Sequence, residues 1–370
     1  MTSSRRIAVL LPDLRPGGAE KMRLHLARQW MERGFGVEFV LRRKQGELLQ
    51  LVPEGASVVD LGVDRVRTML GPLIRYLSAK QPDALLAAMW PMTVVAPLAA
   101  RLSGFRGRVV VSEHNNMTAA YRNRGRGHGA MMRASMGLSY SLADAVVAVS
   151  EGVAQDLARL SRRDRSAFHV IYNPACTETI IPMPAEGAAA HGPKTVLTVG
   201  SLKTQKRHDL LLEAFARLPA SVDAQLVVVG SGELRTALED QARALGIGNK
   251  VVFAGYQADT RSWYAKADLF VLCSDYEGFG NVIVEALEMG VPVVSTDCPS
   301  GPREILADGR YGRLVPTGDI EALRDAILES LQTTHERMAL RARALDFSVE
   351  RVAGQYLDLM FPDKQPQRNN

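Results

Sequence analysis

The sequence has few cysteines, few aromatic residues and no long uninterrupted apolar run. Its three cysteines include no C-x-x-C pair, so neither a disulfide framework nor a zinc site of that spacing is expected, and a reducing compartment is favoured. The apolar stretch at residues 84–100 contains Pro91 and Pro97, which favours a strand, a turn and a helix over a membrane span. The apolar run after Arg5 and Arg6 is too short for a secretory signal, so the expected location is the cytoplasm.

The composition is that of an ordinary globular protein, and its charge is unevenly distributed. The 370 residues are 46% hydrophobic and 23% charged, which excludes disorder and predicts two domains of roughly 150 to 190 residues. Residues 1–185 hold 25 Lys/Arg and 15 Asp/Glu, whereas residues 186–370 hold 20 and 25. A basic first half suits nucleic acid, an acidic membrane surface or a phosphorylated substrate, with solvated arginines on helix faces as the alternative.

Short apolar runs alternate with segments of helical periodicity along the whole chain. This alternation is typical of β-α-β units and predicts two doubly wound α/β domains with parallel sheets. Residues 172–194 contain four prolines and an Ala/Gly stretch, which is typical of a linker between them. The predicted strands are residues 7–11, 37–41, 84–88, 109–112 and 145–150 in the first half, and 195–199, 226–229, 251–254, 269–273 and 293–295 in the second.

Parallel sheets bind ligands beyond the carboxyl ends of their strands, so the loops after the predicted strands are candidate sites. The first loop has Gly17 and Gly18 at a helix start, where free N–H groups and the positive end of the helix dipole suit a phosphate. The second loop has five consecutive polar residues, 112–116, including His114, and predicts a polar ligand. A plain tight turn and a structural histidine are the respective alternatives.

The third loop, residues 200–208, places four potential cations between a strand and a helix. They are Lys203, Lys206, Arg207 and His208. The loop is no P-loop, because Gln205 stands where a glycine is required before the lysine, and residues 230–232 form no dinucleotide motif, because Arg235 replaces the third glycine. We expect the lysines to act as fixed charges on a phosphate, with a solvated basic loop as the alternative.

The fourth loop, residues 277–285, carries the carboxylates of Glu277 and Glu285 beside two glycines at a helix start. Eight residues of helix rise about 12 Å, which exceeds the roughly 5 to 9.5 Å between the paired acids of a glycosidase. The two carboxylates are therefore expected to bind two hydroxyl-bearing parts of one ligand, as a nucleotide sugar offers. A fifth loop, residues 297–304, is expected to close one wall of the pocket, an ordinary rigid turn being the alternative.

Taken in order, these segments resemble the retaining glycosyltransferases of family 4 over nearly the whole chain. The resemblance implies the GT-B fold, an α/β architecture in which two Rossmann-like doubly wound domains face each other across a cleft. It also implies an acceptor-side domain at 1–180, a nucleotide-sugar domain at 181–345, and a segment at 346–370 whose helix crosses back before a frayed tail. The matching segments are 17–20, 113–115, 150–152, 171–174, 199–206, 229–232, 253–255, the E-x7-E of Glu277 and Glu285, and 301–304.

The resemblance implies that the C-terminal domain binds the donor. Glu277 would contact hydroxyls of the transferred sugar, and Glu285 would contact the nucleotide ribose. Lys206 would bind the diphosphate together with the backbone amides of three residues. These residues are Phe279, Gly280 and Asn281.

Further contacts are implied from other loops. Gly17 and Gly18 would approach the phosphates or the sugar from the N-terminal domain, and His114 would line the reaction centre. Tyr256 would contact the base. His114, Glu277 and Lys206 are thus the predicted catalytic residues.

The chain departs from the family pattern in the third loop. Many relatives have arginine directly after the glycine of that loop, whereas this chain has Ser201, so Lys203 or Arg207 is expected to supply the second phosphate cation. The run at residues 300–306 resembles members that build bacterial surface polysaccharides and lipid-linked oligosaccharides, often with UDP-N-acetylhexosamines. A UDP-sugar donor and a glycan or polyprenyl-diphosphate-linked acceptor are therefore expected.

No metal is expected, because the chain has no D-x-D motif. No cofactor is expected either, the nucleotide sugar being a co-substrate. The predicted reaction is retaining, with the leaving phosphate as base. An anionic membrane surface is an expected partner, contacted by arginines 122, 124, 126 and 133 or by those at 159–165, which would place the enzyme peripherally on the cytoplasmic face of the inner membrane.

Two alternatives stay open at this point. One is a UDP-sugar 2-epimerase of the same fold, which would turn over its substrate without an acceptor. The other is a non-catalytic protein that binds a sugar nucleotide or nucleic acid. Nucleic acid is not an expected partner, because the chain has no recognisable reader module and no stripe of interleaved basic and aromatic residues.

Overall fold

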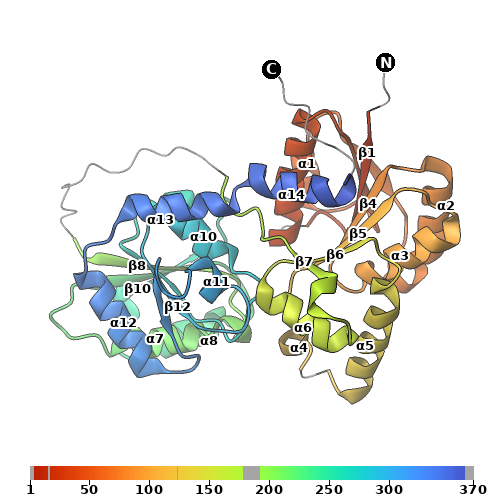
Figure 1. The fold of residues 1–370 in the computed structure, drawn as a ribbon. Helices are drawn as coiled ribbons and strands as arrows, with labels where there is room; N and C mark the ends of the chain where they lie inside the picture. The colour runs from red at the N-terminus through yellow and green to blue at the C-terminus, as the bar shows by residue number, and fades with distance from the viewer. Residues whose placement is uncertain (1–3, 16, 123, 178–191, 363–370) are drawn as a thin grey trace. The chain divides into compact units, whose positions relative to one another are not determined.

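The structure is a computed structural model that describes residues 4–15, 17–122, 124–177 and 192–362. The chain forms two compact units (Figure 1): Met1–Pro174 with Val349–Asn370, and Ala175–Ser348. The predicted boundary between residues 180 and 181 lies outside the described residues, as does the whole predicted tail, residues 363–370. In the described part of the chain, no helix combines the length and the apolar character that crossing a bilayer requires.

The first unit contains a parallel sheet whose described strands run in the order β3-β2-β1-β4-β5-β6-β7. The chain lays β2 and β3 on one side of β1 and then returns to pair β4 with the other side. This reversal puts the topological switch point of the sheet between β1 and β4. The strands are β1 (Arg6–Leu11), β2 (Gly36–Leu41), β3 (Ser57–Asp60), β4 (Ala84–Ala88), β5 (Arg108–Glu113), β6 (Ala145–Ala148) and β7 (Phe168–Val170).

Both faces of this sheet are buried, which explains why its central strands are continuous apolar runs. Ile7 and Val9 of β1 pack in a core with Trp30, whereas Ala8 and Leu10 point to the opposite face and are also fully buried. The helices of the unit are α1 (Gly18–Glu32), α2 (Leu70–Lys80), α3 (Met92–Ser103), α4 (Met117–Ala120), α5 (Arg126–Tyr140), α6 (Glu151–Ser161) and α14 (Val349–Met360).

Helix α14 belongs to the first unit although it ends the described chain. Val352, Ala353 and Tyr356 join the hydrophobic core beside α1. The indole N–H of Trp30 donates a hydrogen bond of 3.1 Å to the carbonyl oxygen of Ala353. The first unit is therefore built from two separate parts of the chain.

The second unit contains a parallel sheet whose described strands run in the order β10-β9-β8-β11-β12-β13. Its switch point lies between β8 and β11, because the chain returns to the free side of β8 after β10. The strands are β8 (Lys194–Val199), β9 (Ala224–Val229), β10 (Val251–Gly255), β11 (Leu269–Leu272), β12 (Val293–Thr296) and β13 (Arg313–Val315). The helices are α7 (His208–Ala216), α8 (Arg235–Ala244), α9 (Arg261–Tyr264), α10 (Asn281–Glu288), α11 (Pro302–Ile305), α12 (Ile320–Gln332) and α13 (Arg337–Ala344).

Candidate functional site

Two of the predicted catalytic residues meet at the switch point of the second unit. Lys206 lies in the loop after β8, and Glu277 lies in the loop after β11, the neighbouring strand. The ammonium group of Lys206 donates to Oε1 of Glu277 at 2.6 Å, and the Ser274 hydroxyl donates to the same oxygen at 2.5 Å. Only 16% of the Lys206 side chain and 10% of the Glu277 side chain are exposed. The fold thus places a nearly buried ion pair where doubly wound sheets bind ligands.

Hydrogen bonds and an ion pair connect the two loops that carry Lys206 and Glu277. The N–H of Asp275 donates to the carbonyl of Gln205 at 2.9 Å, and the Gln205 side chain donates to the carbonyl of Tyr276 at 2.7 Å. Arg207, in the left-handed conformation, forms ion pairs with Asp209 at 3.0 Å and Asp275 at 3.2 Å. These contacts fix the position of Lys206 relative to Glu277.

The predicted cationic loop carries less charge than its residues suggest. His208 is buried, and burial together with the charge of Lys206 lowers its pKa to about 4, so it is neutral at pH 7 and the expectation of a fourth cation is wrong. The Arg207 charge is already balanced by two carboxylates. Ser201 and Lys203 are exposed. Of the two residues expected to replace the missing arginine, Lys203 is therefore the better placed.

Helix α10 begins without a side-chain cap. Gly280 has a φ of +103° and caps the helix, so Asn281 begins it. The Phe279 side chain is buried and packs edge-on against Phe347 with ring centroids 5.3 Å apart. The Phe279 side chain therefore belongs to the core of the second unit, and the role expected for its amide stays a prediction.

Gly301, in the loop after β12, packs against the backbone of Phe279, just before the start of α10. A Cβ at Gly301 would lie 1.8 Å from the carbonyl oxygen of Phe279, and its φ is +100°. The N–H of Glu277 also donates to the carbonyl of Pro299 at 3.3 Å. The fifth loop thus packs directly on the loop that carries Glu277.

The second predicted carboxylate, Glu285, is oriented by Tyr264, a residue that no sequence motif indicates. The hydroxyl of Tyr264 donates to Oε2 of Glu285 at 3.0 Å. Burial and the adjacent Glu285 charge raise the pKa of Tyr264 well above its ordinary value, so it remains a donor. Nothing in the local sequence distinguishes this buried tyrosine from a core residue. Tyr256, the predicted base contact, follows Gly255 and is 57% exposed.

His114 lies in the first unit, after β5, and contacts a buried arginine. Its Nε2 is 2.9 Å from Nη2 of Arg23 and 3.2 Å from the hydroxyl of Ser112. Burial and the Arg23 charge lower the pKa of His114 well below its ordinary value, while a hydrogen bond with Asn173 opposes that shift. His114 is therefore a neutral imidazole at pH 7.

The buried carboxylate of Glu113, next to His114, already accepts hydrogen bonds from other residues of the first unit. Glu113 accepts hydrogen bonds from the hydroxyls of Thr93 and Tyr140, at 2.5 and 2.9 Å, and from the N–H of Trp90 at 3.1 Å. Burial raises the pKa of Glu113. The expectation that a polar ligand explains this polar strand end is wrong for Glu113.

The predicted phosphate contact at α1 has a carboxylate beside it. Gly17 caps α1 and Gly18 begins it, and a Cβ at Gly17 would lie 2.1 Å from Oε2 of Glu20. Burial raises the pKa of Glu20. An anion that binds the amides of Gly17 and Gly18 requires this side chain to turn away.

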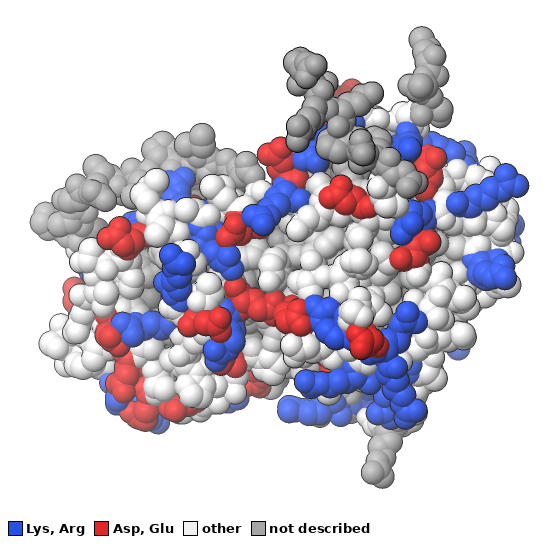
Figure 2. Space-filling model, in the orientation of Figure 1, with Lys and Arg blue, Asp and Glu red and all other residues white. Residues whose placement is uncertain are grey.

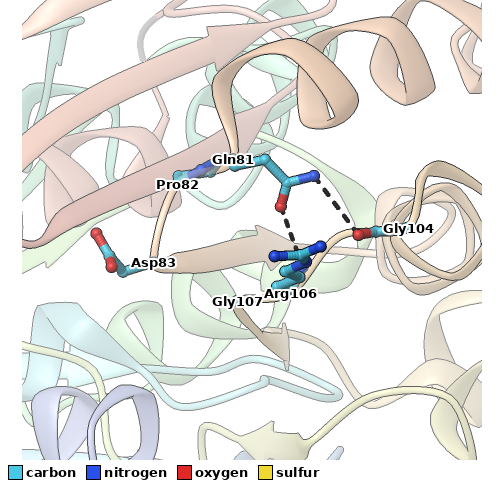
Figure 3. Close-up of a pocket in the computed structure, with 6 residues that line it drawn as sticks. All are labelled: Gln81, Pro82, Asp83, Gly104, Arg106 and Gly107. Atoms are coloured by element: carbon cyan, nitrogen blue, oxygen red, sulfur yellow. Dashed lines mark hydrogen bonds between the residues drawn. The ribbon is translucent and has the colours of Figure 1, made fainter.

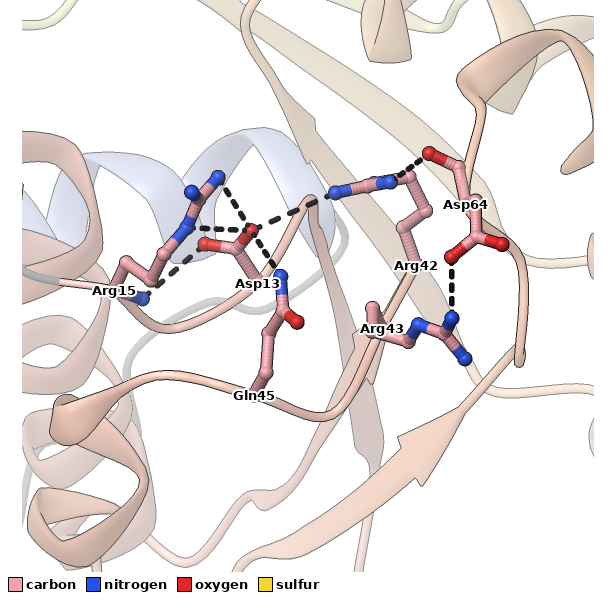
Figure 4. Close-up of polar contacts among 6 residues, drawn as sticks. All are labelled: Asp13, Arg15, Arg42, Arg43, Gln45 and Asp64. Atoms are coloured by element: carbon pink, nitrogen blue, oxygen red, sulfur yellow. Dashed lines mark hydrogen bonds and ion pairs between the residues drawn. The ribbon is translucent and has the colours of Figure 1, made fainter.

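A charged network holds the loop that leads into α1 (Figure 4). Asp13 accepts hydrogen bonds from the side chains of Arg15 and Gln45, at 3.0 and 3.2 Å, and pairs with Arg42 at 3.6 Å. Although burial raises the pKa of Asp13, hydrogen bonds from Arg15 and Gln45 hold it below its ordinary value. The network connects the loop after β1 to the loop after β2. It therefore restrains the segment that precedes the glycines at the start of α1.

A hollow in the first unit lies away from all of these residues (Figure 3). It is lined by the segments before β4 and before β5, where the Gln81 side chain contacts the backbone of Gly104 and Arg106. The hollow is thus at the amino-terminal edge of the sheet, opposite the edge that carries His114. Among the described residues, no three His, Cys, Asp or Glu side chains are grouped to hold a metal ion.

Comparison with known proteins supports one family over both units. The family model described as Glycosyltransferase Family 4 matches residues 16–179, and the one described as Glycosyl transferases group 1 matches residues 182–346. The lipopolysaccharide core biosynthesis glycosyltransferase LpsE of Rhizobium meliloti is 29% identical over 362 residues, which cover 93% of this chain and 96% of that protein.

Two further similarities agree with this result. The N-acetylgalactosamine-N,N'-diacetylbacillosaminyl-diphospho-undecaprenol 4-alpha-N-acetylgalactosaminyltransferase of Campylobacter jejuni is 30% identical over 247 residues, 67% of each chain. The crystal structure of Anabaena Alr3699/HepE in complex with UDP superimposes with a TM-score of 0.77 at 21% identity, covering 96% of this chain and 98% of that one. The expected GT-B fold is confirmed, and the chain belongs to family 4 of the glycosyltransferases.

Proposed function

We propose that this glycosyltransferase moves a hexose or N-acetylhexosamine from a UDP-sugar to a glycan or polyprenyl-diphosphate-linked acceptor, with retention and without a metal, in bacterial surface polysaccharide synthesis. The observation that carries the proposal is the contact of Lys206 with Glu277 at the switch point of the second unit. The names of the relatives from Rhizobium meliloti and Campylobacter jejuni, and the UDP bound to the Anabaena protein, support the substrate classes.

The proposed chemistry follows from charge development. Cleavage of the bond between the anomeric carbon and the diphosphate oxygen leaves positive charge on the sugar and negative charge on the nucleoside diphosphate. Lys206 and the amides at the start of α10 stabilise the leaving diphosphate as fixed positive charges. Glu277 binds sugar hydroxyls while it holds Lys206 in place. The leaving phosphate oxygen takes the proton of the acceptor hydroxyl, which attacks the same face of the sugar.

A screen of donors and acceptors tests this function. We expect UDP-sugars to raise the melting temperature of the full chain more than GDP- or ADP-sugars do, because a ligand that binds only the folded state stabilises it. The donor that stabilises most should then release UDP only when a glycan or polyprenyl-diphosphate-linked acceptor is added. Turnover of a UDP-sugar to its epimer without acceptor would instead identify an epimerase, and stabilisation without any turnover would identify a binding protein.

We also propose that the first unit binds an anionic membrane through the segment around α5. Arg122, Arg124 and Arg133 are exposed, and α5 exposes the apolar side chains of Met131 and Leu138 by 55% and 60%. Figure 2 shows basic side chains gathered over the part of this unit that holds α5 and α6. Cations beside exposed apolar side chains suit the headgroup region of a bilayer.

Replacing Arg122, Arg124 and Arg133 with glutamine should weaken binding to anionic vesicles about 100-fold, since each cation contributes roughly 1 kcal/mol. Sedimentation with phosphatidylglycerol vesicles measures this, and wild-type binding should fall as salt rises. The matched control replaces exposed Arg65, Arg67 and Arg75, which changes the net charge of the same unit equally. Wild-type binding that is indifferent to salt, or an equal loss in the control, contradicts the proposal.

A further inference from the structure

Arg23 is a buried guanidinium whose surroundings are unusual for an arginine. It lies on α1 with 1% of its surface exposed. Its Nη2 contacts the Ser112 hydroxyl and Nε2 of His114, and its charged carbon lies 5.1 Å from the centre of the Tyr356 ring. Its Nε is buried without a hydrogen-bond partner in the described part of the chain. Arginines are rarely buried in this way, so the position calls for a functional explanation.

The contact between Arg23 and His114 determines which imidazole nitrogen carries the hydrogen. A guanidinium only donates hydrogen bonds and keeps its proton in proteins. Two nitrogens 2.9 Å apart cannot both direct a hydrogen at each other, so Nε2 of His114 must be the acceptor. The Ser112 hydroxyl accepts from Arg23 and is free to donate to the same Nε2, 3.2 Å away. In the neutral ring the hydrogen is then on Nδ1.

We propose that Arg23 is a positioning residue that holds His114 as a neutral imidazole with its hydrogen on Nδ1. The lone pair of Nε2 is taken by Arg23, and Nδ1 already carries a hydrogen. His114 therefore accepts no proton from an acceptor hydroxyl during transfer, and its contribution is a hydrogen-bond donor at Nδ1. The part of this inference that concerns turnover rests on the proposed function, whereas the hydrogen position is a property of the folded chain.

The groups around His114 act consistently with this assignment. Burial and the positive charge of Arg23 both disfavour a second proton on the ring, and only the Asn173 side chain favours it. The neighbouring Glu113 is engaged by Thr93 and Tyr140, and burial raises its pKa. The Glu20 carboxyl, on the same helix as Arg23, also has its pKa raised by burial.

Nitrogen-15 NMR of the full chain labelled at histidine tests the hydrogen position directly. The His114 signals are identified as those lost in the His114→Gln spectrum. We expect Nε2 to show the shift of an unprotonated nitrogen and Nδ1 that of a protonated one, with no titration between pH 8 and about pH 5.5, a full unit below an ordinary histidine pKa. A protonated Nε2, or a titration near the ordinary histidine pKa, overturns the proposal even if no substrate has been found.

The Arg23→Met variant tests whether Arg23 determines the position of the hydrogen on the His114 ring. Burial remains in this variant, but the Arg23 charge and its hydrogen bond to Nε2 are gone, so we expect the pKa of His114 to rise and its nitrogen signals to lose the wild-type pattern. Below the new pKa, kcat/KM should fall about tenfold for each pH unit. The melting temperature should stay equal or rise, because an unpaired buried charge has been removed. Arg23→Lys should restore the wild-type pH profile, and Arg28→Met, at an exposed position of the same helix, should leave it unchanged.

The outcomes separate this inference from the proposed function. If His114 keeps its wild-type NMR signals in Arg23→Met, Arg23 does not hold the tautomer and the proposal fails. If Arg23→Met does not fold, Arg23→Gln removes the charge while keeping a polar side chain, and the same two readings decide. If no donor is turned over, the proposed function fails, whereas the NMR result on the wild-type chain still decides the position of the hydrogen.

Discussion

Replacing Glu277 with glutamine is expected to lower kcat about 100- to 1000-fold, the range seen when one preorganised electrostatic contact to a transition state is removed. Glutamine preserves the size of the side chain but removes the charge that faces Lys206 and that would face the positive charge of the reacting sugar. Affinity for free UDP should stay within a few-fold, because the proposed role of the carboxylate is toward the sugar and not the nucleoside. Steady-state kinetics with the identified donor, and calorimetric titration with UDP, measure the two effects.

The control for this variant is Glu329→Gln, which makes the same change at an exposed surface ion pair on α12. We expect it to have almost no effect, since such pairs contribute little. If Glu277→Gln weakens UDP binding as much as it slows turnover, the carboxylate supports the loop instead of the reacting sugar. His114→Ala should also slow turnover while sparing UDP binding.

The Lys206 and Glu277 side chains should behave as one unit. We expect Lys206→Met combined with Glu277→Gln to be little worse than the poorer single variant, with a coupling of about 1 to 3 kcal/mol in the double-mutant cycle. The reason is their 2.6 Å contact, through which each holds the other in place. Losses that simply multiply would mean that the two groups act separately.

Gly301→Ala is expected to destabilise the second unit by at least about 3 kcal/mol, because a steric clash adds to backbone strain. The new Cβ would lie 1.8 Å from the carbonyl oxygen of Phe279 at a φ of +100°, so the loop between Glu277 and Gly280 must move. Donor turnover should fall with it, because that loop carries the carboxylate and the helix start. Urea unfolding and the assay with the identified donor measure both losses.

Gly318→Ala separates the two causes of this effect. Gly318 has a φ of +80°, but no atom lies within 4 Å of an added Cβ. We expect a loss of only about 1 kcal/mol, the cost of a left-handed conformation alone. If both variants lose the same stability, the packing of Gly301 on Phe279 does not matter.

The ten strands predicted from apolar runs are all present, and the described residues form three further strands that the apolar runs do not predict. These strands are β3, β7 and β13, which have three or four residues each and lie at the edges of the two sheets. An edge strand has one neighbour and is only partly covered, so its side chains need not be apolar. Ser57 and Asp60 at the ends of β3, for example, are exposed. A search for apolar runs therefore finds the centre of a sheet before its margins.

The candidate site was predictable as a set of loops but not as a set of contacts. Parallel topology brings the carboxyl ends of β8 and β11 to one edge, so the residues of their loops could be expected near each other. Which cation meets which carboxylate depends on side-chain packing between residues far apart in the chain. Lys206 meets Glu277, 71 residues away, whereas Arg207 meets Asp275, 68 residues away. The burial of Arg23 could not be predicted from the sequence, because an arginine beside an apolar helix stripe normally points to solvent.

The order in which the chain leaves the ribosome has a consequence for the first unit. Trp30 is made early, but its hydrogen-bond acceptor at Ala353 and its aromatic neighbour Tyr356 are among the last described residues to be synthesised. Until then α1 has an uncovered apolar side, while the second unit already has its complete sequence. The unit begun first is therefore the last to be completed, and the apolar side of α1 stays open to non-native contacts until then.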